Sequence, residues 1–189
     1  KVKSFASLKH KNINKFYKRI CKLDLIAAYA LRLLILTATR TKEVIESKFS
    51  EFDLNKKIWT IPEHKMKSGI EHKVPLSDEA INIINLMKQK HNHEHVFHNR
   101  ATGKHISNGA MLVFIKKQFP QLNITVHGFR ATFRTWAEET GNYQHHAIEF
   151  CLAHELPNKV EKAYLRSDLI DARTIIMNDW EKYLISSLS

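Results

Sequence analysis

His127-Gly128-Phe129-Arg130 opens a stretch that passes through Leu152-Ala153-His154 and ends on Ala163-Tyr164-Leu165-Arg166. In a helix that turns about 100° per residue, His127, Arg130 and Arg134 fall on one face. The opposite face is aromatic, and we expect it to be buried: Phe129, Phe133 and Trp136. The stretch therefore predicts a helix that aromatic side chains anchor in the core and that presents a histidine and two arginines.

An arginine beside a histidine suits a phosphodiester, because the guanidinium fork matches two phosphate oxygens. Tyr164 follows as a candidate hydroxyl nucleophile. The alternative is a helix with a solvated basic face, and this stretch taken alone leaves that alternative open.

The charge balance favours a polyanionic partner. The 189 residues include 30 Lys+Arg and 19 Asp+Glu, which gives a formal net charge of +11. Such an excess favours nucleic acid or another anionic surface, although many basic domains only bind and catalyse nothing. The length suits one domain, or one domain with an appended arm.

The cysteines and the apolar runs indicate a cytosolic protein. Cys21 and Cys151 lie far apart without a paired spacing, so we expect two reduced thiols. The longest apolar run, residues 25–36, is too short to cross a bilayer and contains Arg32. No signal peptide is visible, and because the chain begins with Lys1 we expect a trimmed N-terminus.

The first part of the chain predicts a central helix followed by a small sheet. Residues 1–20 predict a linker or a loosely packed lead-in helix, and Asp24 is expected to cap an almost wholly apolar helix that continues to residue 36. Arg40 then interrupts the apolar pattern before a short helix. Three short strands are expected at residues 49–53, 57–61 and 71–75. Lys67 lies in the second turn, where a lysine is usually solvated but where a mobile hairpin could also swing it onto a ligand.

The rest of the chain predicts helices, so the expected fold is mainly α with a small antiparallel three-stranded sheet. Ser77 and Thr125 are expected to cap two of them. The expected ranges are residues 77–88, 107–119, a helix carrying Arg130, residues 143–153, a short helix carrying Tyr164, and residues 169–184. The apolar stripe of the last helix can fold back on this domain or dock on a partner.

A patch of four histidines, His91, His93, His95 and His98, is the unusual feature of the composition. Such a patch can bind metal, but no cysteine accompanies it and it lacks a helical apolar stripe. We expect it to link two elements, with no metal bound.

The order Arg40, Lys67, His127, Arg130, His154, Tyr164 resembles the catalytic domain of tyrosine recombinases, specifically the integrases of satellite phages and genomic islands. Further motifs carry the resemblance from about residue 25 onward: Leu36-Thr37-Ala38-Thr39-Arg40, Trp59-Thr60-Ile61-Pro62, Met66-Lys67, Val74-Pro75-Leu76-Ser77, and Trp180 with Tyr183-Leu184. All of them occur in order at intervals similar to those of the family.

The resemblance implies site-specific DNA cleavage and rejoining through a 3′-phosphotyrosyl bond, without metal or cofactor. Tyr164 would attack the phosphorus, while Arg40, Arg130 and His154 would bind its non-bridging oxygens. Lys67 would protonate the departing 5′ oxygen, and His127 would accept a proton or act as a structural partner. Glu43 would orient Arg40. Arg134 and Lys65 are expected to contact the DNA backbone.

Some positions depart from the family pattern. Ala38 stands where many tyrosine recombinases have glycine, and Lys42 replaces another frequent glycine. The family usually places an arm-site-binding and a core-binding domain before this one. We expect both to lie outside this chain, with residues 21–189 forming one catalytic domain.

The resemblance also implies partners and a setting. These are double-stranded DNA attachment sites, a homo-tetramer on DNA formed from free monomers, an excisionase and a host DNA-bending protein. The expected place is the bacterial cytosol, at the nucleoid, with no membrane partner. Two other functions remain open: a non-catalytic DNA-binding or regulatory module with this fold, and a topoisomerase-like relaxase with the same chemistry.

Overall fold

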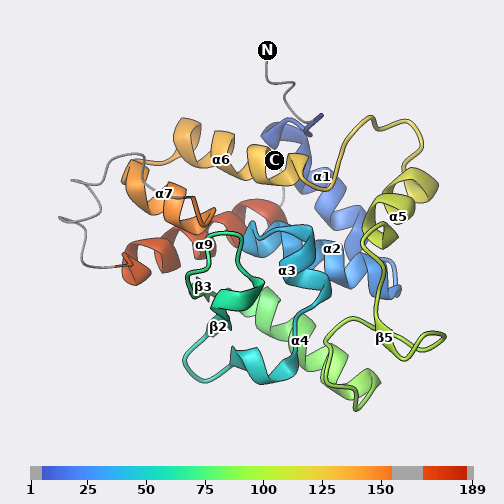
Figure 1. Ribbon diagram of the computed structural model, residues 1–189. Coiled ribbons are helices and arrows are strands. Elements are labelled where there is room, and N and C mark those ends of the chain that lie inside the picture. The colour runs from blue at the N-terminus through green and yellow to red at the C-terminus, as the bar shows by residue number, and fades with distance from the viewer. Residues whose placement is uncertain (1–5, 155–167, 187–189) are drawn as a thin grey trace.

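The computed structural model describes residues 6–154 and 168–186, and its helices pack around α2, Ile26–Thr37 (Figure 1). Every residue from 28 to 37 is buried. Because the sequence of α2 is apolar on all sides, it can receive neighbours in every direction, and the expected central helix is confirmed. Its neighbours are α1 (His10–Cys21), α3 (Thr41–Ile45), α4 (Asp78–Lys90), α5 (Ala110–Gln118), α6 (Gly128–Thr140) and α9 (Ile170–Ile185).

Helix α1 is an integral part of the core, so the loose packing expected before residue 20 is wrong for this helix. Ile13, Phe16, Tyr17 and Ile20 are all buried. Their spacing places them on one helical face, against α2, α6 and α9. The many lysines of this segment obscured that apolar stripe in the sequence.

The three-stranded antiparallel sheet is confirmed, with the strand order β1-β2-β3. Strands β2 (Ile58–Ile61) and β3 (His72–Pro75) pair Trp59 with Val74. Strand β1 is only Phe52–Asp53, because a 3₁₀ turn, η1 (Phe49–Glu51), takes the first part of the expected strand. The β2–β3 connection contains η2 (Glu63–Lys65) and Lys67. A second pair, β4 (His98–Asn99) with β5 (Lys104–His105), was not expected.

Two of the three expected helix caps differ in detail. Asp24 does not cap α2: its carboxylate accepts hydrogen bonds from Tyr29 Oη at 2.9 Å and Lys90 Nζ at 2.7 Å. Ser77 does precede α4, but the carboxylate of Glu181 accepts a hydrogen bond from an amide at the start of that helix, Glu79 N, at 2.8 Å. Thr125 binds the start of α6 as expected, since its hydroxyl accepts from Gly128 N at 3.1 Å.

Helix α9 folds back on its own domain, the first of the two arrangements that the sequence left open. Trp180 is fully buried, and its indole Nε1 donates to Ile35 O in α2 at 2.8 Å. Helix α9 also contacts α1, α6, α7 (His145–Cys151) and β3. Among the described residues, no helix combines the length and apolarity needed to span a bilayer.

Candidate active site

Arg40 lies at the corner between α2 and α3, where two local features fix its position. Ala38 ends α2 in the left-handed conformation with φ of 51°, which a β-carbon disfavours and which explains why glycine suits this position. The buried carboxylate of Glu43 then accepts from Arg40 N at 2.7 Å and from its NH1 at 2.9 Å. Glu43 therefore orients Arg40 by direct contact.

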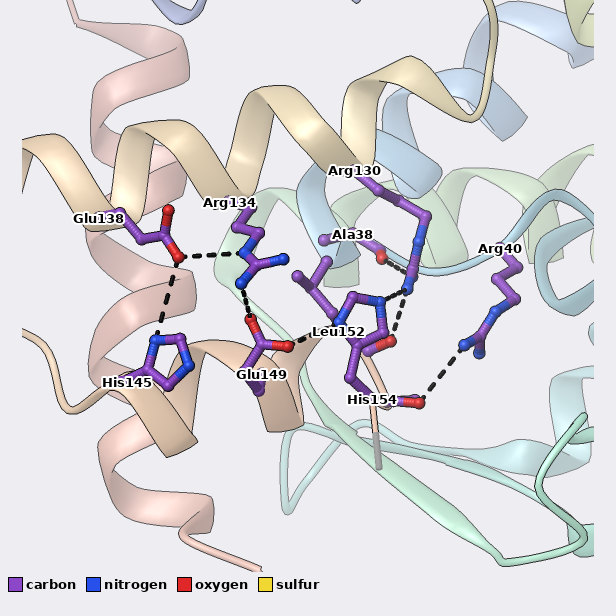
Figure 2. Close-up of polar contacts among 10 residues, drawn as sticks. Ala38, Arg40, Arg130, Arg134, Glu138, His145, Glu149, Leu152 and His154 are labelled. Carbon is purple, nitrogen blue, oxygen red and sulfur yellow. Dashed lines mark hydrogen bonds and ion pairs between the residues drawn. The ribbon is translucent and has the colours of Figure 1, made fainter. Parts of the chain in front are cut away.

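Arg130 reaches from α6 to two other corners of the chain, as Figure 2 shows. Its side chain is buried, because Phe129, Phe133 and Trp136 anchor α6 in the core as the sequence predicted. Its NH1 donates to Ala38 O, and its NH2 donates to Leu152 O at 2.5 Å. The same NH2 lies 3.2 Å from His154 Nε2.

His154 follows α7 through a second left-handed corner, at Ala153 with φ of 48°. Its Nδ1 lies 2.8 Å from Glu149 Oε2, and Arg40 NH2 donates to Ala153 O at 3.4 Å. The structure thus brings Arg40, Arg130 and His154 into one hydrogen-bonded cluster, although they lie far apart in the sequence.

The cluster crowds positive charge into partly buried surroundings. Burial, and then the neighbouring Arg40, lower the pKa of Arg130 to about 10. Burial also lowers the pKa of His154, and Arg130 and Arg40 add to that effect, while the hydrogen bond that His154 donates to Glu149 opposes it. His127 lies at the start of α6, where partial desolvation of its ring, and then the charges of Arg130, Arg40 and His154, lower its pKa. An anion bound here would relieve the repulsion among these groups.

Lys65 and Lys67 of the β2–β3 connection, which the sequence could not tell apart, lie in different environments. Lys65 is engaged within the protein: its Nζ donates to Glu46 O at 2.6 Å and pairs with the nearly buried carboxylate of Glu51. Contact between Lys65 and DNA would have to break that pair, so we do not retain it. Lys67 is exposed in the turn. Tyr164 lies outside the described residues, so its place relative to the cluster stays a prediction.

Arg134, one helical turn after Arg130, pairs with two carboxylates. Its Nε lies 3.0 Å from Glu138 Oε1, and its NH2 lies 3.0 Å from Glu149 Oε1. Its contact with DNA stays a prediction. Glu138, His145 and Glu149 are also the described residues whose ligand atoms converge as a metal site would require. The guanidinium of Arg134 already balances both carboxylates, so we assign no metal there.

The histidine patch does not form such a group within the described chain. His93 and His98 stack with ring centroids 3.4 Å apart, and His91 Nε2 lies 3.1 Å from Val96 O. These rings therefore pack against each other and the backbone.

Two residues of the site escaped the sequence analysis. Glu149 contacts His154, and the available signal was an acid five positions earlier, at the end of a helix. His72 in β3 lies in the field of the same arginines: burial, and then Arg173, Arg40 and Arg130, lower its pKa to about 3. Nothing in the local sequence of β3 showed that its first residue lies close enough to these arginines for their charge to lower its pKa.

Comparisons with known proteins identify the family. A profile described as "Phage integrase family" matches residues 6–169, a range that contains all six residues of the expected set. The chain is 34% identical over 148 residues to prophage integrase IntA of Escherichia coli K12, covering 77% of this chain and 36% of that protein. It is 31% identical over 179 residues to prophage integrase IntZ of the same strain, covering 94% and 44%. The chain thus spans less than half the length of these relatives.

Solved structures agree in fold. The integrase from mycobacterium phage Brujita superimposes with a TM-score of 0.68 at 16% identity, over 100% of this chain and 61% of that one. A lambda integrase tetramer bound to a Holliday junction gives 0.62 at 15% identity, over 89% and 50%. At such identities the likeness shows the fold alone, a tyrosine recombinase catalytic domain. With the family profile matching most of its length, this chain belongs to the phage integrase family of tyrosine recombinases.

Proposed function

We propose that this chain is the catalytic domain of a site-specific DNA recombinase that integrates and excises a mobile element. The observation that supports the proposal most is the joining of Arg40, Arg130 and His154 at the corners that follow α2 and α7. Each of these residues belongs to a motif shared with the family. None is a neighbour of another in sequence, so a solvated basic face does not account for their arrangement.

The cluster suits a phosphodiester undergoing substitution. Two guanidinium groups can each donate to non-bridging oxygens, whose negative charge grows as phosphorus becomes five-coordinate. Both arginines are already held by the protein, Arg40 by Glu43 and Arg130 by backbone carbonyls. Little reorganisation is then needed when the phosphate enters, and this is the condition under which such donors accelerate a reaction most.

In the proposed reaction, the Tyr164 oxygen forms a bond to phosphorus as the bond from phosphorus to the 5′ oxygen breaks. The phenol proton passes to His127 or to water, because a tyrosine with its reference pKa of about 10 is a weak nucleophile at neutral pH. Lys67 gives a proton to the departing 5′ oxygen, which leaves as a hydroxyl. The product is a 3′-phosphotyrosyl ester.

The ester retains the energy of the cleaved bond, so the strands can be resealed without a nucleotide cofactor. A 5′-hydroxyl of a second strand attacks the phosphotyrosyl phosphorus, and Tyr164 leaves as the phenol. The net charge of +11 favours the DNA partner. We extend the proposal to a tetramer on two attachment sites, with an excisionase and a host DNA-bending protein as accessory partners, in the bacterial cytoplasm.

The test is trapping of the covalent intermediate. The protein is incubated with nicked duplexes in which the nick lies a few nucleotides beyond the scissile phosphate, so that the short 5′-hydroxyl fragment diffuses away. Because the attachment site is unknown, the sequence around the nick is randomised. We expect a denaturation-resistant protein–DNA adduct that is lost in Tyr164→Phe.

The randomised pool also distinguishes the alternatives. Salt-sensitive DNA binding without any adduct would overturn the proposal in favour of a non-catalytic binding module. Sequencing of trapped DNA reports specificity, because a recombinase enriches a defined sequence and a relaxase accepts many.

A further inference from the structure

A continuous chain of polar contacts joins α6 to α7 and passes through Glu149 (Figure 2). Arg134 NH2 lies 3.0 Å from Glu149 Oε1, and Glu149 Oε2 lies 2.8 Å from His154 Nδ1. On its far side, the His154 ring presents Nε2 to Arg130 NH2 at 3.2 Å. Glu149 thus contacts the side of His154 that faces away from the arginine cluster, and it touches neither arginine of that cluster.

The two neighbours of the ring select one arrangement of its proton. A carboxylate only accepts hydrogen bonds, so His154 must carry hydrogen on Nδ1 to bind Glu149. A guanidinium only donates, so Nε2 of the neutral ring must accept from Arg130. Both contacts agree on the Nδ1–H tautomer. When the ring gains a second proton, that proton can only be added at Nε2, the nitrogen that faces the cluster.

We propose that Glu149 is a positioning residue that fixes this tautomer and supports the charged form of His154. As an imidazolium held from behind by a carboxylate, His154 exchanges the contact of its Nε2 with Arg130 for a hydrogen bond that Nε2 donates to the scissile phosphate. The inference rests on the proposed function, because it supplies a donor to the phosphate of that reaction.

The charges around the ring agree with this role. Arg130 from α6 and Arg40 from the α2–α3 corner disfavour the imidazolium, and Glu149 from α7 favours it. His127 is also close enough to His154 for the charges of the two rings to interact. Arg134, which pairs with Glu138 as well, orients Glu149 from behind. A bound phosphate would offset the two arginines, so His154 is expected to become charged as DNA enters.

The first experiment needs no activity. In the intact chain at pH 8, where His154 is neutral, nitrogen-15 NMR of the histidine ring distinguishes Nδ1–H from Nε2–H. We expect Nδ1–H in the native protein. In Glu149→Ala we expect a larger fraction of Nε2–H, the form that free histidine prefers, because only the contact with Arg130 then still selects Nδ1–H. An Nε2–H ring in the native protein, or an unchanged ring in Glu149→Ala, would overturn the inference.

The second experiment measures the rate of adduct formation against pH. Glu149→Gln keeps the shape of the side chain but removes its charge, so the decline in rate with rising pH should begin about one pH unit lower. Glu138→Gln is the matched control: it removes the same charge from the other partner of Arg134, does not touch His154, and should keep the native profile. Identical profiles for Glu149→Gln and the native protein would contradict the inference. Absence of any adduct in the native protein would instead count against the proposed function, and the NMR experiment would still decide the role of Glu149.

Discussion

Arg130 has a structural role as well as its proposed chemical one. Its donors to Ala38 O and Leu152 O tie together the ends of α2 and α7, and its remaining donors face His154 and the proposed phosphate. A lysine at this position would keep the charge but could not span these acceptors, because an ammonium is a compact point charge.

We therefore predict that Arg130→Ala and Arg130→Lys both slow adduct formation at least about 100-fold, as loss of one phosphate-stabilising donor typically does. The single-turnover rate is measured at saturating DNA, after thermal melting has shown that the protein is folded at the assay temperature. Arg100→Ala, which removes an exposed arginine, is the control and should react normally. A folded Arg130→Lys protein with a native rate would refute the assignment.

His72 predicts how stability depends on pH. Its folded-state pKa of about 3 lies below the usual 6.5, so the unfolded chain binds more protons between these values. The free energy of unfolding should therefore fall as pH drops below about 6.5, with a slope of up to about 1.4 kcal/mol per pH unit from this residue.

Urea denaturation between pH 7 and 5.5 measures that slope before most carboxylates titrate. His72→Gln should reduce this slope by the contribution of His72, whereas replacing the exposed His64 in the neighbouring turn should leave it unchanged. Equal slopes in all three proteins would show that His72 is not buried in its neutral form.

At the level of the elements, the β2–β3 hairpin carries one lysine with a structural role, Lys65, and one exposed lysine, Lys67. Lys65 and Glu51 have side chains only 10% and 9% exposed, so each ion compensates the other away from water. Trp59 Nε1 also donates to Glu51, at 3.0 Å, which ties the pair to the sheet. The exposed turn that follows leaves Lys67 able to approach a bound DNA strand.

Substitution of Lys65 should then affect stability, and substitution of Lys67 should affect the rate of cleavage. Lys65→Ala should lower the free energy of unfolding by about 3 kcal/mol, since it leaves a buried carboxylate without its partner. Lys67→Ala should be stable but should cleave at least about 100-fold more slowly. Replacing the leaving 5′ oxygen by sulfur should restore the rate, because a thiolate leaves without protonation; a Lys67→Ala defect that persists with the sulfur substrate would exclude a general acid role.

Helix α9 is a core element, and its two sides should respond differently to substitution. Trp180 is fully buried, so Trp180→Ala should lower the free energy of unfolding by about 3–5 kcal/mol. Ile175 on the same helix is 59% exposed, and Ile175→Ala should change stability by less than about 0.5 kcal/mol. Equal, small effects in urea denaturation would show that α9 does not pack on this domain in solution.

Across the whole molecule, the sequence predicted what local patterns encode. The almost wholly apolar α2, the aromatic face of α6 and the three-stranded sheet all follow from sequence patterns over a few residues. The sequence did not reveal that α1 packs into the core, because its lysines interrupt the apolar stripe. Asp24 and Ser77 do not cap their helices as expected: Asp24 binds Tyr29 and Lys90 instead, and Glu181 binds the start of α4.

The candidate site also has a part that the sequence predicted and a part that only the structure revealed. Motif order supplied Arg40, Arg130 and His154, which the structure brings together. The contacts of Arg130 with Ala38, 92 residues away, and of Arg173 with Lys73, 100 residues away, are long-range, and no local pattern reveals them. His72 was missed for this reason, because the arginines that lower its pKa are distant in sequence. Glu149 lies only five residues before His154, and its local signal, an acid at the end of a helix, was overlooked.

The most direct test of the account is to locate the DNA attachment in the trapped adduct. Tyr164 lies between Lys162 and Arg166, so trypsin should release Ala163-Tyr164-Leu165-Arg166 as a short peptide. After nuclease digestion, mass spectrometry should find this peptide carrying a nucleotide through a phosphate that alkaline phosphatase cannot remove. A nucleotide attached to any other residue, or an adduct that Tyr164→Phe still forms, would contradict the account.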